Sequence, residues 1–324
     1  MSATERKTYL RTELRAIPSQ IDERDMAILR ALLEHKVLTT DQLSTLFFRS
    51  LRRCQQRLKD LTDLGLLGSF DPKRGFGSGR LPDHRFLTEL GVAVLAHRDG
   101  LPRAQLPWVP DEAYADNRNL LHRMGVNAFF CALVEASRLT EGHCLHRWAP
   151  ERKIRTRAGE IQPDGFGRYL HPGGACQFYL EYDRGTEGPA ALARKLRSYL
   201  RFAAGWGEGA PFPNVLVVVP DPSREGDVGE GLAAAVRGPG RNAKLPLFVT
   251  SEELLSARGV LGPVWAVPDE DHYRIALTEL PAVGATPYDR TRCLGRSWTD
   301  PGARSRISPL SAAPRFPTGH PREP

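Results

Sequence analysis

Three short motifs decide the fold of this chain: Gln162-Pro163-Asp164-Gly165, Phe178-Tyr179-Leu180-Glu181-Tyr182-Asp183-Arg184-Gly185-Thr186-Glu187 and Arg194-Lys195-Leu196. Aromatic and apolar residues run together from Phe178 to Tyr182 and end at a turn, which predicts a β-strand. Residues 166–170 predict a preceding strand, and the His171-Pro172-Gly173-Gly174 sequence between them predicts a turn. The sequence therefore predicts a β-hairpin.

Three carboxylates lie on this hairpin. Glu181 and Asp183 are two residues apart, so both project to the same side of one strand. Asp164 stands near the start of the preceding strand, and the hairpin would bring all three acids together. Helical spacing over residues 187–204 predicts an amphipathic helix with Lys195 near its middle. We expect a cluster of acids with a lysine beside it.

The segments around the hairpin alternate between helical and strand patterns. The β-branched run at 214–220 is typical of a strand buried on both faces. Strand and helix spacing in succession implies an α/β sheet with some parallel pairing. The other expected elements are a helix at 117–138, a strand at 144–148, a helix at 229–237, a strand at 245–250 and a helix at 251–257.

The amino-terminal part predicts three short helices followed by two strands. Asp22, then Thr39 or Thr40, then Ser50 are the expected N-caps of these helices. Residues 66–70 and 84–87 predict strands around a glycine-rich basic loop. This order resembles a winged helix-turn-helix, in which the third helix enters the major groove of DNA and the wing touches the backbone or minor groove.

Basic and amide side chains gather on the third helix and on the loop tip. Such donors suit phosphates and base edges, so we predict double-stranded DNA as the partner. A merely solvated basic face and a winged helix that binds protein are the alternatives. The candidate DNA-binding residues are Arg49, Arg52, Arg53, Gln56, Arg57 and Lys59 of the helix and Lys73, Arg74 and Arg80 of the loop.

Length, net charge and composition limit the classes of protein to which this chain can belong. The chain has 324 residues and a formal net charge of +7, enough length for two domains and a charge that favours a polyanionic partner. No apolar run approaches the roughly 20 residues that cross a membrane, and the first residues are charged, so we expect a cytoplasmic protein without a membrane partner. Five scattered cysteines without a C-x-x-C pair predict reduced thiols rather than a disulfide framework or zinc site.

Changes in pattern along the chain predict the domain boundaries. We expect a flexible arm at 1–20, a winged helix-turn-helix domain at 21–98 and a linker at 99–116. An α/β domain follows at 117–284. A disordered tail rich in proline, arginine, serine and glycine completes the chain at 285–324.

The second domain resembles the restriction-endonuclease-like fold, the PD-(D/E)XK group, whose mixed sheet is flanked by helices. Asp164, after Pro163, and Glu181 match the two acids of that group, and the resemblance implies that they hold Mg²⁺ or Mn²⁺. Asp183 stands where the group carries its lysine, and Lys195 would substitute from the next helix. The implied catalytic set is Asp164, Glu181, Asp183 and Lys195. The residues alone also allow a structural ion network, in which Glu181 and Asp183 pair with Arg184, Arg194 or Lys195.

Together the two halves resemble the replication-relaxation protein family over roughly residues 20–260. The resemblance implies a DNA-binding protein of a plasmid or other mobile element that acts in replication, relaxation or mobilisation. Two alternatives stay open, an active Mg²⁺-dependent DNA endonuclease and a transcriptional regulator with an inactive nuclease-like domain. A homodimer and complexes with other plasmid-encoded proteins stay open as well.

Overall fold

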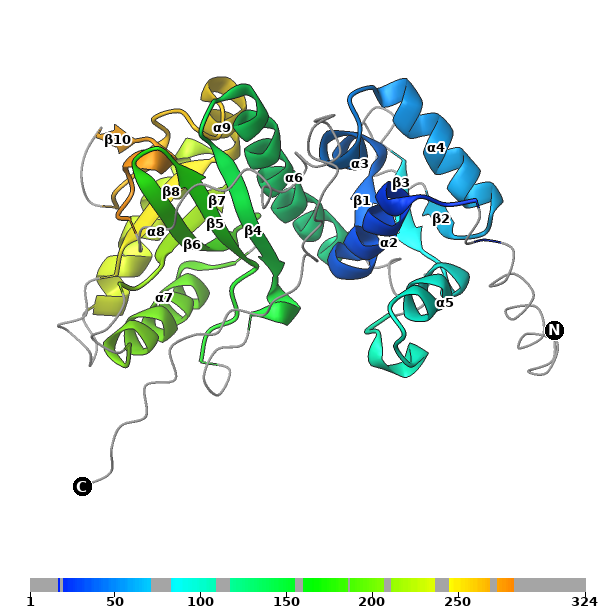
Figure 1. Cartoon of the computed structure of the whole chain (residues 1–324). Coiled ribbons are helices and arrows are strands. Elements are labelled where there is room, and N and C mark those ends of the chain that lie inside the picture. Colours follow the sequence, from blue (N-terminus) through cyan, green and yellow to red (C-terminus); the bar gives the residue numbers. More distant parts are fainter. Residues whose placement is uncertain are drawn as a thin grey trace. The chain divides into compact units, whose positions relative to one another are not determined.

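The structure is a computed structural model of the chain (Figure 1). It describes residues 17, 20–70, 83–108, 117–154, 160–185, 187–206, 211–236, 245–268 and 273–282. They divide into two compact units, the first ending at Cys131 and the second beginning at Ala132. Each unit is described by itself.

The first unit contains short helices and a three-stranded antiparallel sheet. The sheet has the order β1-β3-β2, so the two predicted strands pair with each other and a third strand joins them. That third strand, β1, is too short to show an alternating pattern in the sequence. The elements are α2 (Glu23–His35), β1 (Val37–Thr39), α3 (Thr40–Phe47), α4 (Leu51–Asp63), β2 (Leu67–Phe70), β3 (His84–Leu87) and α5 (Glu89–Arg98).

Capping explains where these helices begin. The side chain of Asp22 accepts a hydrogen bond from the backbone N–H of Asp25, and the Asp25 side chain accepts one from the backbone N–H of Asp22. Thr39 and Gln42 form the same reciprocal pair at the start of α3. Ser50 occupies the N-cap position of α4 as predicted, but its side chain makes no capping hydrogen bond.

The first unit extends past the predicted end of its domain at residue 98. The Lys36 ammonium donates to the backbone carbonyl of Pro107 at 2.7 Å, and the Trp108 indole N–H donates to the carbonyl of Leu87 at 2.7 Å. Asn127, from the first half of the next helix, donates to the carbonyl of Val37 at 2.9 Å. The first half of that helix therefore belongs to this unit, although it lies beyond the predicted linker.

The second unit is built on a seven-stranded mixed sheet with the order β10-β9-β8-β7-β6-β5-β4. Neighbouring strands from β4 to β6 are antiparallel, and β7 pairs in parallel with both β6 and β8, which confirms the expected α/β sheet with parallel pairing. The strands are β4 (Cys144–Pro150), β5 (Gly165–His171), β6 (Gly174–Tyr182), β7 (Asn214–Val219), β8 (Leu247–Ser251), β9 (Trp265–Ala266) and β10 (Arg274–Ile275). The helices are α6 (Asn117–Leu139, beginning in the first unit), α7 (Pro189–Ala204), α8 (Pro222–Val236) and α9 (Glu252–Arg258).

The predicted hairpin is confirmed as β5 and β6. Gly165 pairs with Leu180 and Gly167 with Phe178 along its antiparallel register. A Cβ atom at Gly167 would lie 2.1 Å from the Phe178 ring, so glycine allows that ring to rest on the neighbouring strand. This register carries Asp164, just before β5, alongside the end of β6.

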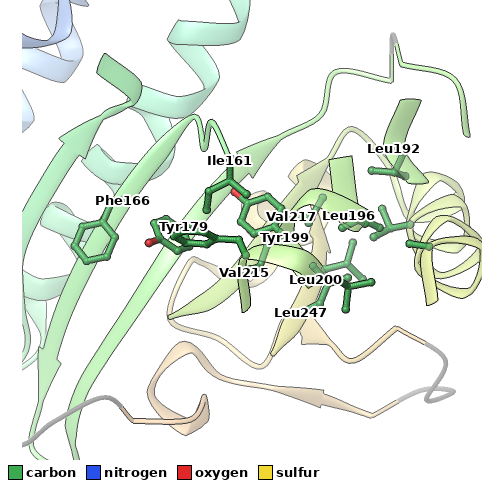
Figure 2. Close-up of a cluster of buried hydrophobic side chains, with 14 of the residues drawn as sticks. Ile161, Phe166, Tyr179, Leu192, Leu196, Tyr199, Leu200, Val215, Val217 and Leu247 are labelled. Atoms are coloured by element: carbon green, nitrogen blue, oxygen red, sulfur yellow. The ribbon is translucent and has the colours of Figure 1, made fainter. Parts of the chain in front are cut away.

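An apolar core joins α7 to the parallel strands (Figure 2). Helix α8 contributes Val228 and Ala235 to the same core. Leu192, Leu196 and Tyr199 of α7 are buried against Val215 and Val217 of β7. Because these contacts fix the rotation of α7 about its axis, they also fix the positions of its polar side chains. The helix that carries Lys195 is thus held in a fixed orientation against the sheet.

Three further features differ from the sequence predictions. Helix α8 begins at Pro222 rather than Gly229, because the Asp221 side chain accepts from the Arg224 backbone N–H at 3.2 Å and starts the helix earlier. Strands β9 and β10, of two residues each, were not predicted. Cys144 is disulfide-bonded, so the prediction of reduced thiols throughout is wrong there, since spacing along the chain does not reveal neighbours in space.

Several predictions fall outside the described residues. They concern most of the arm at 1–20, the loop tip at 71–80 with Lys73, Arg74 and Arg80, and the tail at 285–324. Among the helices that the structure describes, none is long and apolar enough to cross a membrane.

Candidate nucleic-acid interface and carboxylate cluster

Helix α4 turns a basic end away from the core. Cys54, Leu58 and Leu61 are buried on its inner side. Arg52 and Arg53 in its first turn are exposed, as is Arg49 just before it, and no salt bridge of these three occurs within the described residues. Three cationic side chains are therefore presented to solvent at the start of α4.

The second half of α4 is neutralised by its own acids. The Lys59 ammonium lies 2.6 Å from the Asp63 carboxylate. The Asp60 carboxylate lies 3.8 Å from the Arg57 guanidinium and also accepts from the Gln56 amide at 2.9 Å. These partners lie three or four residues apart, the spacing that brings side chains together on a helix. The positive charge of the helix is consequently concentrated at its amino-terminal end.

Arg57 has a structural partner that sequence reasoning missed. Its guanidinium holds the carboxylate of Asp25 through two hydrogen bonds, Nε to Oδ1 at 2.9 Å and Nη2 to Oδ2 at 2.5 Å. The Asp25 side chain is fully buried. A sequence signal exists, because Asp25 falls on the same helical face as apolar Ile28, Leu29 and Leu32, where a carboxylate needs a partner. Arg57 thus ties α4 to α2.

Three of the four predicted catalytic residues come together at the hairpin. The Lys195 ammonium lies 2.5 Å from Oε2 of buried Glu181, and the Tyr199 hydroxyl donates to Oε1 of the same carboxylate. Oδ2 of Asp164 accepts from the backbone N–H of Tyr182 at 2.8 Å. Sequence reasoning did not place Tyr199 in the site, although its position four residues after Lys195 puts both on one side of α7.

Asp183 takes a different partner. Its Oδ2 lies 2.8 Å from the guanidinium of Arg224, and its Oδ1 accepts from the backbone N–H of Gly185 at 2.8 Å. Strand β6 ends at Tyr182, so the two-residue periodicity used to align Asp183 with Glu181 no longer applies beyond it. Asp183 therefore ties the end of β6 to α8 instead of joining Lys195.

Burial and charge set the protonation of the cluster. Burial raises the pKa of Glu181 to about 8 and the nearby Asp164 charge adds to this, while Lys195 and Tyr199 act in the opposite direction. Burial alone would lower the pKa of Lys195, but Glu181 and Asp164 attract its charge and raise it. Burial also raises the pKa of Tyr199 well above its usual value. At neutral pH the lysine is charged and the tyrosine is a neutral donor.

Comparison with known families identifies the family of this chain. The family described as replication-relaxation matches residues 29–215, more than half of the chain. The chain belongs to the replication-relaxation family. No curated protein and no solved structure matches it. The matched span of this replication-relaxation protein contains both the basic end of α4 and the cluster of Asp164, Glu181, Lys195 and Tyr199.

The cluster of this replication-relaxation protein fits a metal ion only in part. Asp164, just before β5, and Glu181, on the neighbouring strand β6, offer carboxylates, and Mg²⁺ is commonly held by one or two carboxylates together with substrate phosphates. Both oxygens of Glu181 already have partners, however, and Lys195 would have to leave Oε2 for a cation to approach it. Within the described ranges, no three His, Cys, Asp or Glu side chains gather as a metal-binding group.

Proposed function

We propose that this member of the replication-relaxation family binds double-stranded DNA of a plasmid or other mobile element and acts in its replication, relaxation or mobilisation. The family match supports the process. The basic end of α4 carries the proposal of DNA binding, because Arg49, Arg52 and Arg53 are exposed while the other charged side chains of that helix are paired. Arginine binds phosphates and guanine edges through its planar fork of donors.

The order of elements in the first unit supports the same proposal. Helices α2, α3 and α4 follow in close succession, and the antiparallel strands β2 and β3 come directly after α4. In a winged helix-turn-helix the third helix enters the major groove with its amino-terminal residues toward the bases. The uncompensated arginines stand at that end of α4.

We predict that Arg52→Ala and Arg53→Ala each weaken DNA binding without unfolding the chain. Each lost phosphate contact should lower the slope of log K against log salt by about one unit. Fluorescence anisotropy of a labelled duplex at several salt concentrations measures this slope. Arg98→Ala is the matched control, because Arg98 is an exposed arginine of the same unit that is ion-paired with Glu23. Slopes that fall equally in all three variants would contradict a specific role for α4.

The convergence of Asp164, Glu181 and Lys195 favours a second candidate, a Mg²⁺-dependent DNA endonuclease. Bound Mg²⁺ would neutralise charge on the phosphate under attack. The chain's own contribution would come from Lys195, whose side chain is 33% exposed and can turn its ammonium from Glu181 toward a phosphate. Tyr199 would keep the Glu181 carboxylate in place during that movement.

This second candidate predicts nicking of supercoiled plasmid in Mg²⁺ or Mn²⁺ by the wild-type chain. Asp164→Ala and Glu181→Ala should abolish the nicking while Asp164→Ala still binds DNA. Gel electrophoresis of the plasmid topoisomers gives the answer. Unchanged topology with the wild type would remove the cleavage hypothesis and favour a DNA-binding regulator with an inactive nuclease-like domain.

A further inference from the structure

Helix α7 has an exposed basic face in addition to the face that contributes Lys195 to the cluster. Its 16 residues contain four basic side chains and no acid. Lys195 is turned toward Glu181, whereas Arg194, Arg197 and Arg201 are exposed. Their spacing of three and four residues aligns these arginines along one face of the helix. We name this row of Arg194, Arg197 and Arg201 the α7 arginine stripe.

The stripe is not neutralised by nearby acids in the part of the chain that the structure describes. Arg201 donates to the hydroxyl of Ser198, and no salt bridge joins a stripe arginine to a carboxylate. Helix α8 packs beside α7 in the shared core and contains three acids. Two of them are already paired, Glu225 with Arg274 and Asp227 with Arg224, while Glu230 is exposed. Helix α7 thus presents positive charge without compensation.

The dimensions of the stripe match a DNA backbone. A helix rises 1.5 Å per residue, so the seven-residue step from Arg194 to Arg201 covers about 10 Å. Phosphates of one DNA strand rise about 3.4 Å each along the duplex axis, so this length spans about three phosphate steps, and the long arginine side chains can reach phosphates spread over it. The three guanidinium groups can therefore each meet a phosphate of the same strand.

We propose that the α7 arginine stripe is a second DNA-binding surface, which grips the phosphate backbone of duplex DNA independently of base sequence. This inference rests on the proposed function, because duplex DNA is the occupant in both cases. Charge complementarity selects this occupant, since a row of exposed arginines with no salt bridge among the described residues suits the phosphates of a DNA backbone. The second unit then holds DNA itself, on the helix that also contributes Lys195 to the cluster with Glu181.

The test removes the arginines singly and together by Arg194→Gln, Arg197→Gln and Arg201→Gln in the full chain. We expect each single variant to lower the slope of log K against log salt by about one unit on a duplex of arbitrary sequence, and the triple variant by nearly three. Arg258→Gln is the matched control, because Arg258 is an exposed arginine at the end of α9 in the same unit. Circular dichroism melting verifies that the variants remain folded, as expected for exposed positions.

The outcomes separate this inference from the proposed function. The proposal for the stripe would be wrong if the triple variant kept the wild-type slope while Arg52→Ala and Arg53→Ala lowered it. Binding of DNA by α4 would then still stand. A lower slope in the triple variant alone, with wild-type slopes in Arg52→Ala and Arg53→Ala, would support the stripe and contradict the role of α4. An equal loss in Arg258→Gln would show that only total charge matters, and would overturn the stripe.

Discussion

Arg57→Ala should lower the free energy of unfolding by about 3 kcal/mol, because it leaves a buried carboxylate without its partner. The Asp25 side chain is fully buried, and Arg57 is its cationic partner, bound at 2.9 and 2.5 Å. Asp25 also accepts from the backbone N–H of Asp22, so the start of α2 should loosen with it. Urea denaturation followed by circular dichroism measures the loss.

The neighbouring exposed arginine provides the control for this prediction. Arg53→Ala changes the same helix without touching Asp25, so its stability should stay within about 0.5 kcal/mol of wild type. A double variant, Asp25→Ala with Arg57→Ala, should be less destabilised than the sum of the single changes, because the two side chains act on each other. A loss below 1 kcal/mol for Arg57→Ala would show that the ion pair is not structural. Arg57 is accordingly a poor position at which to test DNA binding.

Stability should also fall with rising pH because of Glu181. Its pKa in the folded chain, about 8, lies above the ordinary value of 4.5, so the folded state holds this proton more tightly than the unfolded state. The resulting stabilisation is complete below pH 4.5 and is lost as the pH rises through 8. Between pH 6 and pH 9 we expect a loss of about 3 kcal/mol. Urea midpoints measured across this range test it.

Glu181→Gln isolates the contribution of this one group. Glutamine can still accept the hydrogen bond of Tyr199 but does not titrate, and Lys195, one third exposed, can turn to solvent. The difference in unfolding free energy between wild type and Glu181→Gln should therefore change with pH, while titration of other groups cancels. Parallel pH profiles for the two proteins would contradict the raised pKa.

Much of the fold could be predicted because local patterns agreed with the final packing. The β-branched run at 214–220 formed a fully buried strand, and Asp22 and Thr39 capped the helices that they preceded. The first turns of α8 were hard to predict because they contain Gly226 and Gly229, and glycine has a low helix propensity. The capping carboxylate of Asp221 outweighs that low propensity. Strands of two or three residues gave no periodic signal.

The site was harder to predict because it depends on contacts between distant residues. Asp164, Glu181 and Lys195 could be grouped from the hairpin and the following helix. The sequence could not reveal that Asp183 would bind Arg224, 41 residues away. It also could not show which basic side chains would be neutralised, since Arg57 is bound by Asp25 from another helix and Lys59 by Asp63. Only the folded structure shows that Arg52 and Arg53 are exposed whereas Arg57 is bound to Asp25.

The most direct test of the account is the salt dependence of duplex-DNA binding by the wild-type chain and by the double variant Arg52→Ala with Arg53→Ala. Both proteins should melt at similar temperatures, because both side chains are exposed. We predict that the wild type binds DNA with a steep slope of log K against log salt, and that this slope is smaller by nearly two units in the double variant. A wild-type chain that does not bind DNA, or two proteins with the same slope, would contradict it.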